Sequence, residues 1–278
     1  MKSAKKFNLA GIALVTVLSA VILASWTAKT RAEMNLAFDN MPRILGIGLG
    51  VVPDYEGSDD YTFGIAPFAR FQFGDTERYI IVKAYEVQIN LLDHPWLRLG
   101  PSLNYRFGRD DVDDKVVDDM KDIDDTVEAG GFIGVEFIDQ ANPRKRFMAS
   151  VDFLADLGSE HDGYSIYFNT KVWYPVSRMF DIGLGAGFSY ADSDYMETYF
   201  GVDRSDSARS GLPMFDADSG IKDLRIYPMA IMHLSPNWHV GAGVQYRVMV
   251  GDADDSPVVD DRGSSSQWIA GIGLGYSW

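Results

Sequence analysis

The chain has 278 residues, a formal net charge of −15 and no cysteine. The lack of cysteine excludes a disulfide framework and thiolate chemistry, and the acidic excess argues against nucleic acid or an anionic lipid surface as a partner. The mean hydropathy is close to zero, which excludes a bundle of membrane-spanning helices but suits strands with one apolar and one polar face.

The N-terminus has the three parts of a secretory signal peptide. A start with three lysines precedes an apolar run over residues 9–26, and Thr-Arg-Ala at residues 30–32 offers a small-x-small cleavage site. We therefore predict a cleaved signal peptide over residues 1–32 and a single mature domain over residues 33–278. A retained membrane anchor is the alternative, because the apolar run is long for a signal.

Alternation with a period of two recurs through the mature chain. Aromatic and aliphatic side chains fall on one face of each segment, and Arg, Glu, Asp and Gly fall on the other. Lengths of about 9–13 residues match those of tilted transmembrane strands. The eleven segments are residues 44–52, 61–73, 79–91, 96–108, 126–138, 146–157, 164–174, 180–190, 224–234, 238–250 and 267–278.

The connections between these segments are of two kinds. Toward the C-terminus, long acidic loops alternate with turns of a few residues, which is typical of outer-membrane barrels with long extracellular loops and short periplasmic turns. The sequence therefore predicts a transmembrane antiparallel up-and-down β-barrel. Bacterial single-chain barrels have an even number of strands. Residues 79–91 as a kinked pair would give twelve strands, which we favour, and omission of an N-terminal segment would give ten.

Charged residues on the non-aromatic faces are expected to point into the barrel. Their mixed signs suit either a narrow water path or a lumen closed by ion pairs. We expect the stretch 191–222 to be irregular, and it is long enough to fold inward as a plug. The inward charges are Arg70, Arg98, Arg106, Lys171, Arg225 and Arg247 together with Glu86, Glu128, Glu136, Asp152, Asp156 and Asp181.

Residues that could carry chemistry are few. His161 and Asp162, with Ser159 nearby, contain the residue types of a serine hydrolase, but such a site needs all three groups to converge. We expect a solvated loop here, no enzyme and no cofactor. His233 and His239 flank a short turn, and we expect them to be interfacial or lumen-facing rather than a metal pair.

Nine aspartates occur within residues 109–125. Carboxylates are suitable ligands for calcium or magnesium, but the run lacks the ordered spacing of an EF-hand loop. We predict a solvated, self-repelling surface loop without a metal site.

Several loop segments resemble the MipA/OmpV family of outer-membrane proteins. The matching segments are residues 195–202, 207–213, 217–223 and 251–259, with weaker matches at residues 53–58 and 108–110. Within them we single out as family-signature positions Tyr195, Tyr199, Phe200, Gly201, Ser210, Gly211, Leu212, Gly220, Ile221, Asp223, Gly251, Asp252, Asp255, Ser256 and Pro257.

The closing segment 267–278 ends on an aromatic residue. Leu274, Tyr276 and Trp278 share its apolar face, and we predict that they close the barrel and present the end that the barrel-assembly machinery recognises. Barrels of the resembled family more often end on Phe, and Trp keeps the aromatic character.

The resemblance implies a monomeric, non-enzymatic protein of the cell outer membrane, in contact with lipid and lipopolysaccharide. The family takes its name from a member that binds a membrane-bound lytic transglycosylase and bridges it to a murein synthase, so scaffolding of peptidoglycan remodelling is the expected role. A small passive channel and a surface adhesin or antigen acting through the acidic loops are the alternatives, because a fold transfers better than a role.

Overall fold

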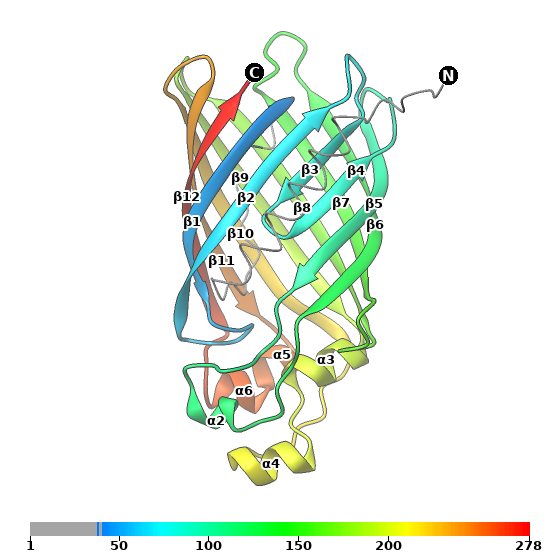
Figure 1. Cartoon of the computed structure of the whole chain (residues 1–278), viewed down its shortest axis with the longest axis vertical. Helices are drawn as coiled ribbons and strands as arrows, with labels where there is room; N and C mark the ends of the chain where they lie inside the picture. Colours follow the sequence, from blue (N-terminus) through cyan, green and yellow to red (C-terminus); the bar gives the residue numbers. More distant parts are fainter. Residues whose placement is uncertain (1–37, 39–40) are drawn as a thin grey trace, which may run out of the picture.

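The computed structural model describes residue 38 and residues 41–278, so the predicted signal peptide lies outside the described residues. Twelve antiparallel strands close into one barrel (Figure 1). The strands are β1 (Arg43–Pro53), β2 (Tyr61–Gln72), β3 (Tyr79–Lys83), β4 (Glu86–Asn90), β5 (Leu97–Arg106), β6 (Thr126–Ile138), β7 (Arg146–Asp156), β8 (Tyr164–Pro175), β9 (Phe180–Ala191), β10 (Gly220–His233), β11 (Trp238–Met249) and β12 (Ser266–Ser277).

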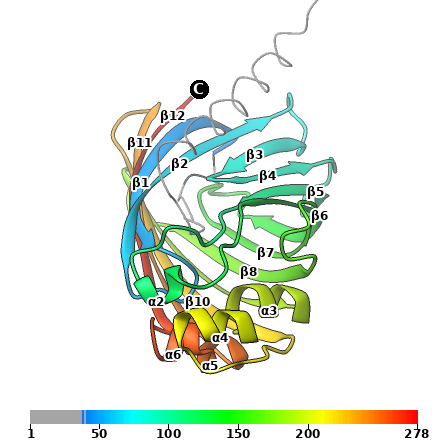
Figure 2. The same ribbon diagram turned by 60° about the horizontal axis from the view of Figure 1, so that its bottom comes forward.

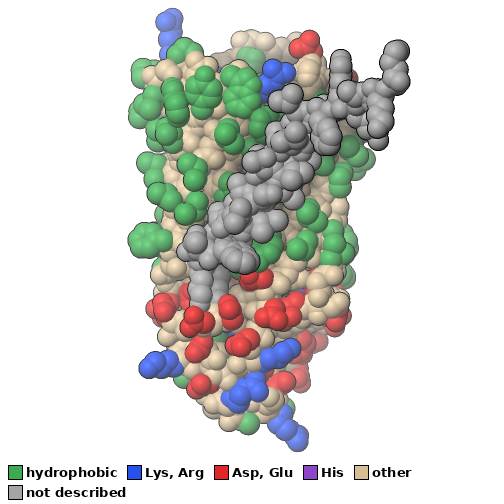
Figure 3. Space-filling view, viewed as in Figure 1, with side chains coloured by type: hydrophobic (Ala, Val, Ile, Leu, Met, Phe, Trp, Pro, Cys, Tyr) green, Lys and Arg blue, Asp and Glu red, His purple; other side chains and the backbone are tan. Residues whose placement is uncertain are grey.

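Each strand pairs with its neighbours in sequence, and β12 pairs with β1 to close the wall. The alternation read from the sequence becomes an outer and an inner face: on β1, Leu45, Ile47 and Leu49 are exposed, whereas Ile44 and Val52 are buried. Figure 3 shows apolar side chains over the outer wall, with acidic side chains gathered toward one end. An apolar exterior around a polar interior is the construction that a bilayer requires of a barrel, so the predicted fold class is confirmed.

The segment predicted at residues 79–91 is two strands. Lys83 of β3 pairs with Glu86 of β4, so only Ala84 and Tyr85 form the turn between them. Ala84 has a φ of 53°, in the left-handed region, which lets the chain reverse within two residues. Twelve strands are therefore confirmed and the ten-strand alternative is wrong.

The two ends of the barrel differ. The turns 73–78, 91–96, 139–145, 176–179 and 234–237 lie at one end, where Figure 1 also shows the C-terminus. Short helices lie together at the other end, as Figure 2 shows. They are α2 (Lys115–Asp118), α3 (Ser193–Phe200), α4 (Arg204–Ser210), α5 (Asp252–Asp255) and α6 (Pro257–Asp260). Because outer-membrane barrels have short periplasmic turns, the turn-bearing end is periplasmic and the helix-bearing end is extracellular. We call the extracellular end the upper end of the barrel; it is at the bottom of Figure 1.

No helix among the described residues is long and apolar enough to cross a membrane.

Large aromatic side chains fill the middle of the lumen. Trp173 and Tyr227 are buried there, in one cluster with Phe38 and Phe68. A Cβ added at Gly185 would lie 2.0 Å from the ring of Tyr227, and one added at Gly183 would lie 2.8 Å from the indole of Trp173. The inward glycines of β9 therefore make the room that these rings occupy.

Candidate functional site

Ion pairs between neighbouring strands line one side of the periplasmic half of the lumen. The side chains of Arg98 and Glu136 are almost fully buried and lie 3.0 Å apart, and Arg146 reaches the second oxygen of Glu136 at 3.1 Å. Arg98 also contacts Glu77 of a periplasmic turn at 2.8 Å. Asp152 accepts a hydrogen bond from Gln88 at 2.5 Å. The inward charges of this half are therefore paired with one another, whereas the choice between a water path and a closed lumen stays a prediction.

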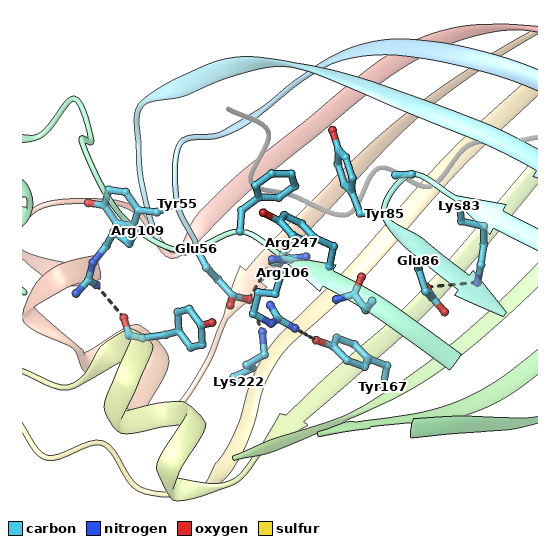
Figure 4. Close-up of a pocket in the computed structure, with 16 residues that line it drawn as sticks. Tyr55, Glu56, Lys83, Tyr85, Glu86, Arg106, Arg109, Tyr167, Lys222 and Arg247 are labelled. Carbon is cyan, nitrogen blue, oxygen red and sulfur yellow. Dashed lines mark hydrogen bonds and ion pairs between the residues drawn. The ribbon is translucent and has the colours of Figure 1, made fainter. Parts of the chain in front are cut away.

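A second group of charges lies under the helices and centres on Glu56. Glu56 is held by Lys222, by Arg247 at 3.2 Å and by the hydroxyl of Tyr195, which donates at 2.8 Å. We call these four residues the Glu56 cluster; Figure 4 shows Glu56, Lys222 and Arg247. Burial opposes ionisation of Glu56, but Lys222, Arg247 and Arg106 outweigh it and lower the pKa of this carboxyl to about 2. Glu56 is therefore a carboxylate at every physiological pH.

Arg106 connects the Glu56 cluster to the opposite wall. Its guanidinium lies 2.7 Å from Glu128, donates to the hydroxyl of Tyr167 at 2.6 Å, and sits 5.0 Å from the centre of the Tyr195 ring. Both carboxylate oxygens of Glu128 are engaged, since Asn104 donates to the second oxygen at 2.7 Å. A cation held by a carboxylate, a phenol and an aromatic face is fixed in position rather than mobile.

A cavity of about 80 Å³ lies beside the Glu56 cluster, and we call it the upper cavity. Its lining includes Glu56, Arg106, Lys222 and Arg247 together with the turn residues Ala84 and Tyr85 (Figure 4). A second cavity of about 110 Å³ lies lower in the lumen, around Gln88, Arg98 and Asp152. Both are small beside the pockets of roughly 300–1,000 Å³ that hold whole small molecules.

The stretch 191–222, predicted as an irregular loop and plug, is ordered. Asp192 caps α3 by accepting from the backbone of Tyr195, and the rings of Tyr195 and Tyr199 lie against the inward Arg106 of β5. The helix α4 lies farther from the barrel wall than α3 (Figure 1). The two ends of the stretch extend β9 and β10, because Gly220 pairs with Ala191. The expectation of a long irregular loop is therefore wrong, and the inward packing of its aromatic residues is what the structure has.

Most of the family-signature positions come together in the helices α2 to α6 and the loops that join them to the barrel. We call this layer the cap. Ser256 donates to the carbonyl of Phe200 at 2.6 Å, which joins two loops more than fifty residues apart in sequence. Leu212 packs in a buried cluster with Val202 and Val258. The backbone of Asp218 donates to Asp252 at 2.7 Å.

The remaining signature positions shape the ends of cap elements. Gly211 ends α4 with a φ of 78°, Gly251 has a φ of 61°, and Pro257 opens α6. Ser210 donates back to the carbonyl of Asp206, and Gly201 ends α3 against Glu197. Of the others, Ile221 is exposed on the outer wall, Asp223 is buried beside Lys222, and Asp255 ends α5.

His161 is not part of a hydrolase triad. It is buried, its ring packs on Tyr195 and Tyr199, and its Nε2 lies 3.3 Å from Glu128. Ser159 and Asp162 are exposed, so the three groups do not converge. The expectation that this histidine is solvated is wrong, because the loop folds its ring into the lumen beneath α3.

The aspartate-rich run 109–125 is also more ordered than predicted. Val112, Val117, Met120 and Ile123 are buried, because they pack in apolar clusters with residues of the other extracellular loops. Asp114 caps α2 and pairs with Arg262 at 2.5 Å. Within residues 41–278, no cluster of three or more His, Asp or Glu side chains could hold a metal ion.

His233 and His239 face the lumen near the periplasmic end, which is one of the two placements predicted. Their Nδ1 atoms lie 2.8 Å apart, and His233 reaches Asp181 at 2.9 Å. Asp181 is also bound by Arg144 of the turn 139–145. This histidine pair is therefore part of the network that holds the periplasmic turns together.

The alternation in the sequence correctly predicts Arg106, Glu128 and Arg247 as inward charges, but it does not predict that Glu56 and Lys222 point inward. Glu56 lies in a loop, where no alternation operates, and Lys222 precedes the strand segment predicted at 224–234. The only signal at Glu56 was the weak family match over residues 53–58.

A closed barrel with an apolar belt, a polar interior and short turns at one end defines an outer-membrane β-barrel protein. The chain belongs to the MipA family, described as MltA-interacting protein MipA, which it matches over residues 45–278. The family prediction is thereby confirmed.

Solved structures with similar folds include OmpT, an outer membrane protein of Vibrio cholerae, with a TM-score of 0.38 and 10% identity over 85% of this chain and 96% of that chain. The translocator domain of the autotransporter NalP from Neisseria meningitidis has a TM-score of 0.43 and 11% identity over 99% of this chain and 100% of that chain. No curated protein matches the chain.

Proposed function

We propose that this barrel is a non-conducting, non-enzymatic docking platform for peptidoglycan-remodelling enzymes on the periplasmic side of the outer membrane. The family description names an interaction with MltA. The partners in this proposal are those that the resemblance implies, a membrane-bound lytic transglycosylase and a murein synthase that joins through it. The observation that carries the proposal for this chain is the way its periplasmic turns are tied to one another.

Arg144 makes the central contacts of this platform. From the turn 139–145 it donates to the carbonyls of Ser177 at 2.9 Å and Arg178 at 3.2 Å, and it pairs with Asp181 at 2.5 Å. His233 binds the same Asp181, which ties in the end of β10. Turns fixed in this way present a rigid surface, and a rigid surface lowers the entropy lost when a partner binds.

Two apolar side chains project from the tied turn 176–179. Val176 is 58% exposed and Met179 is 56% exposed. Exposed apolar groups on a rigid polar frame are the kind of anchor on which binding energy concentrates. We therefore place the docking surface at the turn 176–179 and the neighbouring turn 139–145.

Exchanging both residues for aspartate (V176D/M179D) is expected to lower recovery of a lytic transglycosylase about tenfold or more in pull-downs from envelope extract, because the partner would have to desolvate two carboxylates. M214D is the matched control, since Met214 is 58% exposed at the extracellular end. Folding of each variant is checked by heat-modifiable gel mobility. Equal recovery with V176D/M179D and M214D would contradict this placement.

The same proposal predicts the electrical behaviour of the barrel. Purified protein in planar bilayers is expected to give no steady ohmic steps, because large side chains such as Trp173 and Tyr227 are buried inside the lumen and Tyr195 and Tyr199 are buried at its extracellular mouth. Steady steps would favour the alternative of a passive channel.

A further inference from the structure

One sector of the barrel wall is incomplete in its extracellular half. β2 has twelve residues, but β3 pairs only with its last five, from Phe68 to Gln72. Among the described residues, no strand pairs with residues 61–67 of β2 on that side, and the backbone contact at its limit is Ala84 donating to the carbonyl of Pro67 at 2.9 Å. Figure 1 shows the β3–β4 hairpin ending partway along the wall between β2 and β5. We call this interval the wall slot. It is bounded by residues 61–67 of β2, by the turn 84–85 and by residues 105–108.

Aromatic side chains close the wall slot. The hydroxyl of Tyr85 donates to the carbonyl of Ile65 at 2.7 Å, across the interval that a longer hairpin would have filled. The ring of Tyr85 meets Phe107 edge-on at 4.7 Å, and Phe107 meets Tyr105 at 5.0 Å. A backbone edge facing lipid is costly, and side chains that can change rotamer are a weaker closure than a ladder of backbone hydrogen bonds.

The upper cavity lies directly behind the wall slot. Ala84, Tyr85, Tyr105 and Phe107 line both, so these residues separate the membrane from the Glu56 cluster. The lining cations are Lys83, Arg106, Arg109, Lys222 and Arg247, against the carboxylates Glu56 and Glu86. Tyr199 also lines this cavity; the residue is 7% exposed and its hydroxyl has no hydrogen-bond partner within the described residues. The chain is acidic as a whole, but cations outnumber carboxylates around this cavity.

We propose that the wall slot admits the headgroup of a lipid with a terminal, anionic phosphate from the outer leaflet into the upper cavity, while its acyl chains stay in the membrane. Guanidinium and ammonium groups are the usual ligands of phosphate, and the Tyr199 hydroxyl is a further donor. A cavity of about 80 Å³ is too small for a whole lipid and suits one polar end. Outside the slot, Phe63 is 81% exposed and offers apolar contact for the chains.

The proposal is independent of docking at the periplasmic turns. An extended peptide could instead pair with the edge of β2, since an unpaired strand accepts another strand. The lipid is favoured because the slot faces the membrane and leads to a cationic cavity, features that strand pairing does not need.

The test uses the full mature barrel in phosphatidylcholine nanodiscs, with F63W as a fluorescent reporter at the slot and the barrel without F63W as background. A minor fraction of phosphatidic acid with brominated chains is expected to quench the reporter more than the same fraction of brominated phosphatidylcholine. This excess quenching measures enrichment at the slot of the lipid with a terminal phosphate, because phosphatidylcholine carries its phosphate beneath a bulky trimethylammonium group and has no net charge.

Charge variants then locate the headgroup. K83Q alters a partly exposed side chain and is expected to weaken the enrichment severalfold, and K83Q/R109Q is expected to weaken it about tenfold or more, as loss of charge-assisted bonds predicts. K171Q is the matched control, because Lys171 lines the lower cavity. K83Q keeps the test decisive if the double variant fails to show heat-modifiable folding. Equal quenching by both lipids, which is the result expected if the β2 edge instead receives a peptide strand, overturns the proposal, and so does an excess that K83Q leaves unchanged.

Discussion

Replacing Glu56 with glutamine is expected to destabilise the folded barrel by roughly 3–5 kcal/mol, the range measured when one partner of a buried ion pair is removed. The side chains of Lys222 and Arg247 are 2% and 9% exposed, and both lie against Glu56. Glutamine keeps the shape and can still accept from Tyr195, but it leaves these two cations without the carboxylate. Urea unfolding of the protein in lipid vesicles measures the change.

The matched control is R262Q. Arg262 pairs with Asp114 in the cap, but its side chain is 38% exposed. Exposed pairs contribute roughly 0–1 kcal/mol, so this variant should unfold close to the parent. An E56Q barrel as stable as R262Q would show that the Glu56 cluster does not hold the cap to the wall.

The low pKa of Glu56 also fixes the pH range over which this contribution changes. The carboxyl titrates at about 2 in the folded barrel against a usual value of 4.5, so its contribution is fully present above pH 4.5. As the pH falls from 4.5 through 2, the unfolded chain takes up this proton first, and the contribution is lost. The parent should therefore lose more stability than E56Q over that interval, and equal losses would argue against the lowered pKa.

Deleting Trp278 is expected to cause a large loss of correctly inserted barrel. The Trp278 ring lies 5.7 Å from Phe71 of β2 and is stacked at 6.4 Å on Tyr276, next to the β12–β1 seam that closes the wall. The indole is 54% exposed, so its removal alters few buried contacts. The expected defect is therefore in recognition by the assembly machinery rather than in the stability of the finished barrel.

The measurement is the fraction of heat-modifiable protein in outer-membrane preparations. W278F keeps an aromatic end and should restore insertion, whereas W238F, at an exposed tryptophan of the neighbouring strand β11, should behave like the parent. Parental amounts of folded barrel after deletion of Trp278 would refute the role of the terminal aromatic.

The sequence predicted the wall closely where alternation is regular. Segments 126–138 and 146–157 agree with β6 and β7 to within one residue, because each inward charge alternates with an outward apolar residue. It was least accurate where strands are shortest or extend beyond the membrane. The turn at Ala84 and Tyr85 carries no glycine or proline as a marker, and β10 begins at Gly220, four residues before the predicted segment.

The packing of the cap could not be predicted from the sequence, for a different reason. Val117 and Met120 lie in the run 109–125, which was expected to be a solvated loop, and His161 was also expected to be solvated. All three are buried because loops from separate hairpins pack on one another above the lumen. No local pattern encodes contacts of that kind, which depend on bringing distant loops to the same end of a barrel.

The sequence by itself determined that the chain is a β-barrel of the outer-membrane type with a charged interior. The reason is that a bilayer imposes a period of two on every strand that crosses it. Only the tertiary structure decided which charges meet. Glu56 reaches Lys222 and Arg247 across most of the chain, and Tyr85 reaches Ile65 across a place where no strand of the described residues pairs with β2. Closing the barrel brings these residues together, and their spacing along the chain gives no sign of it.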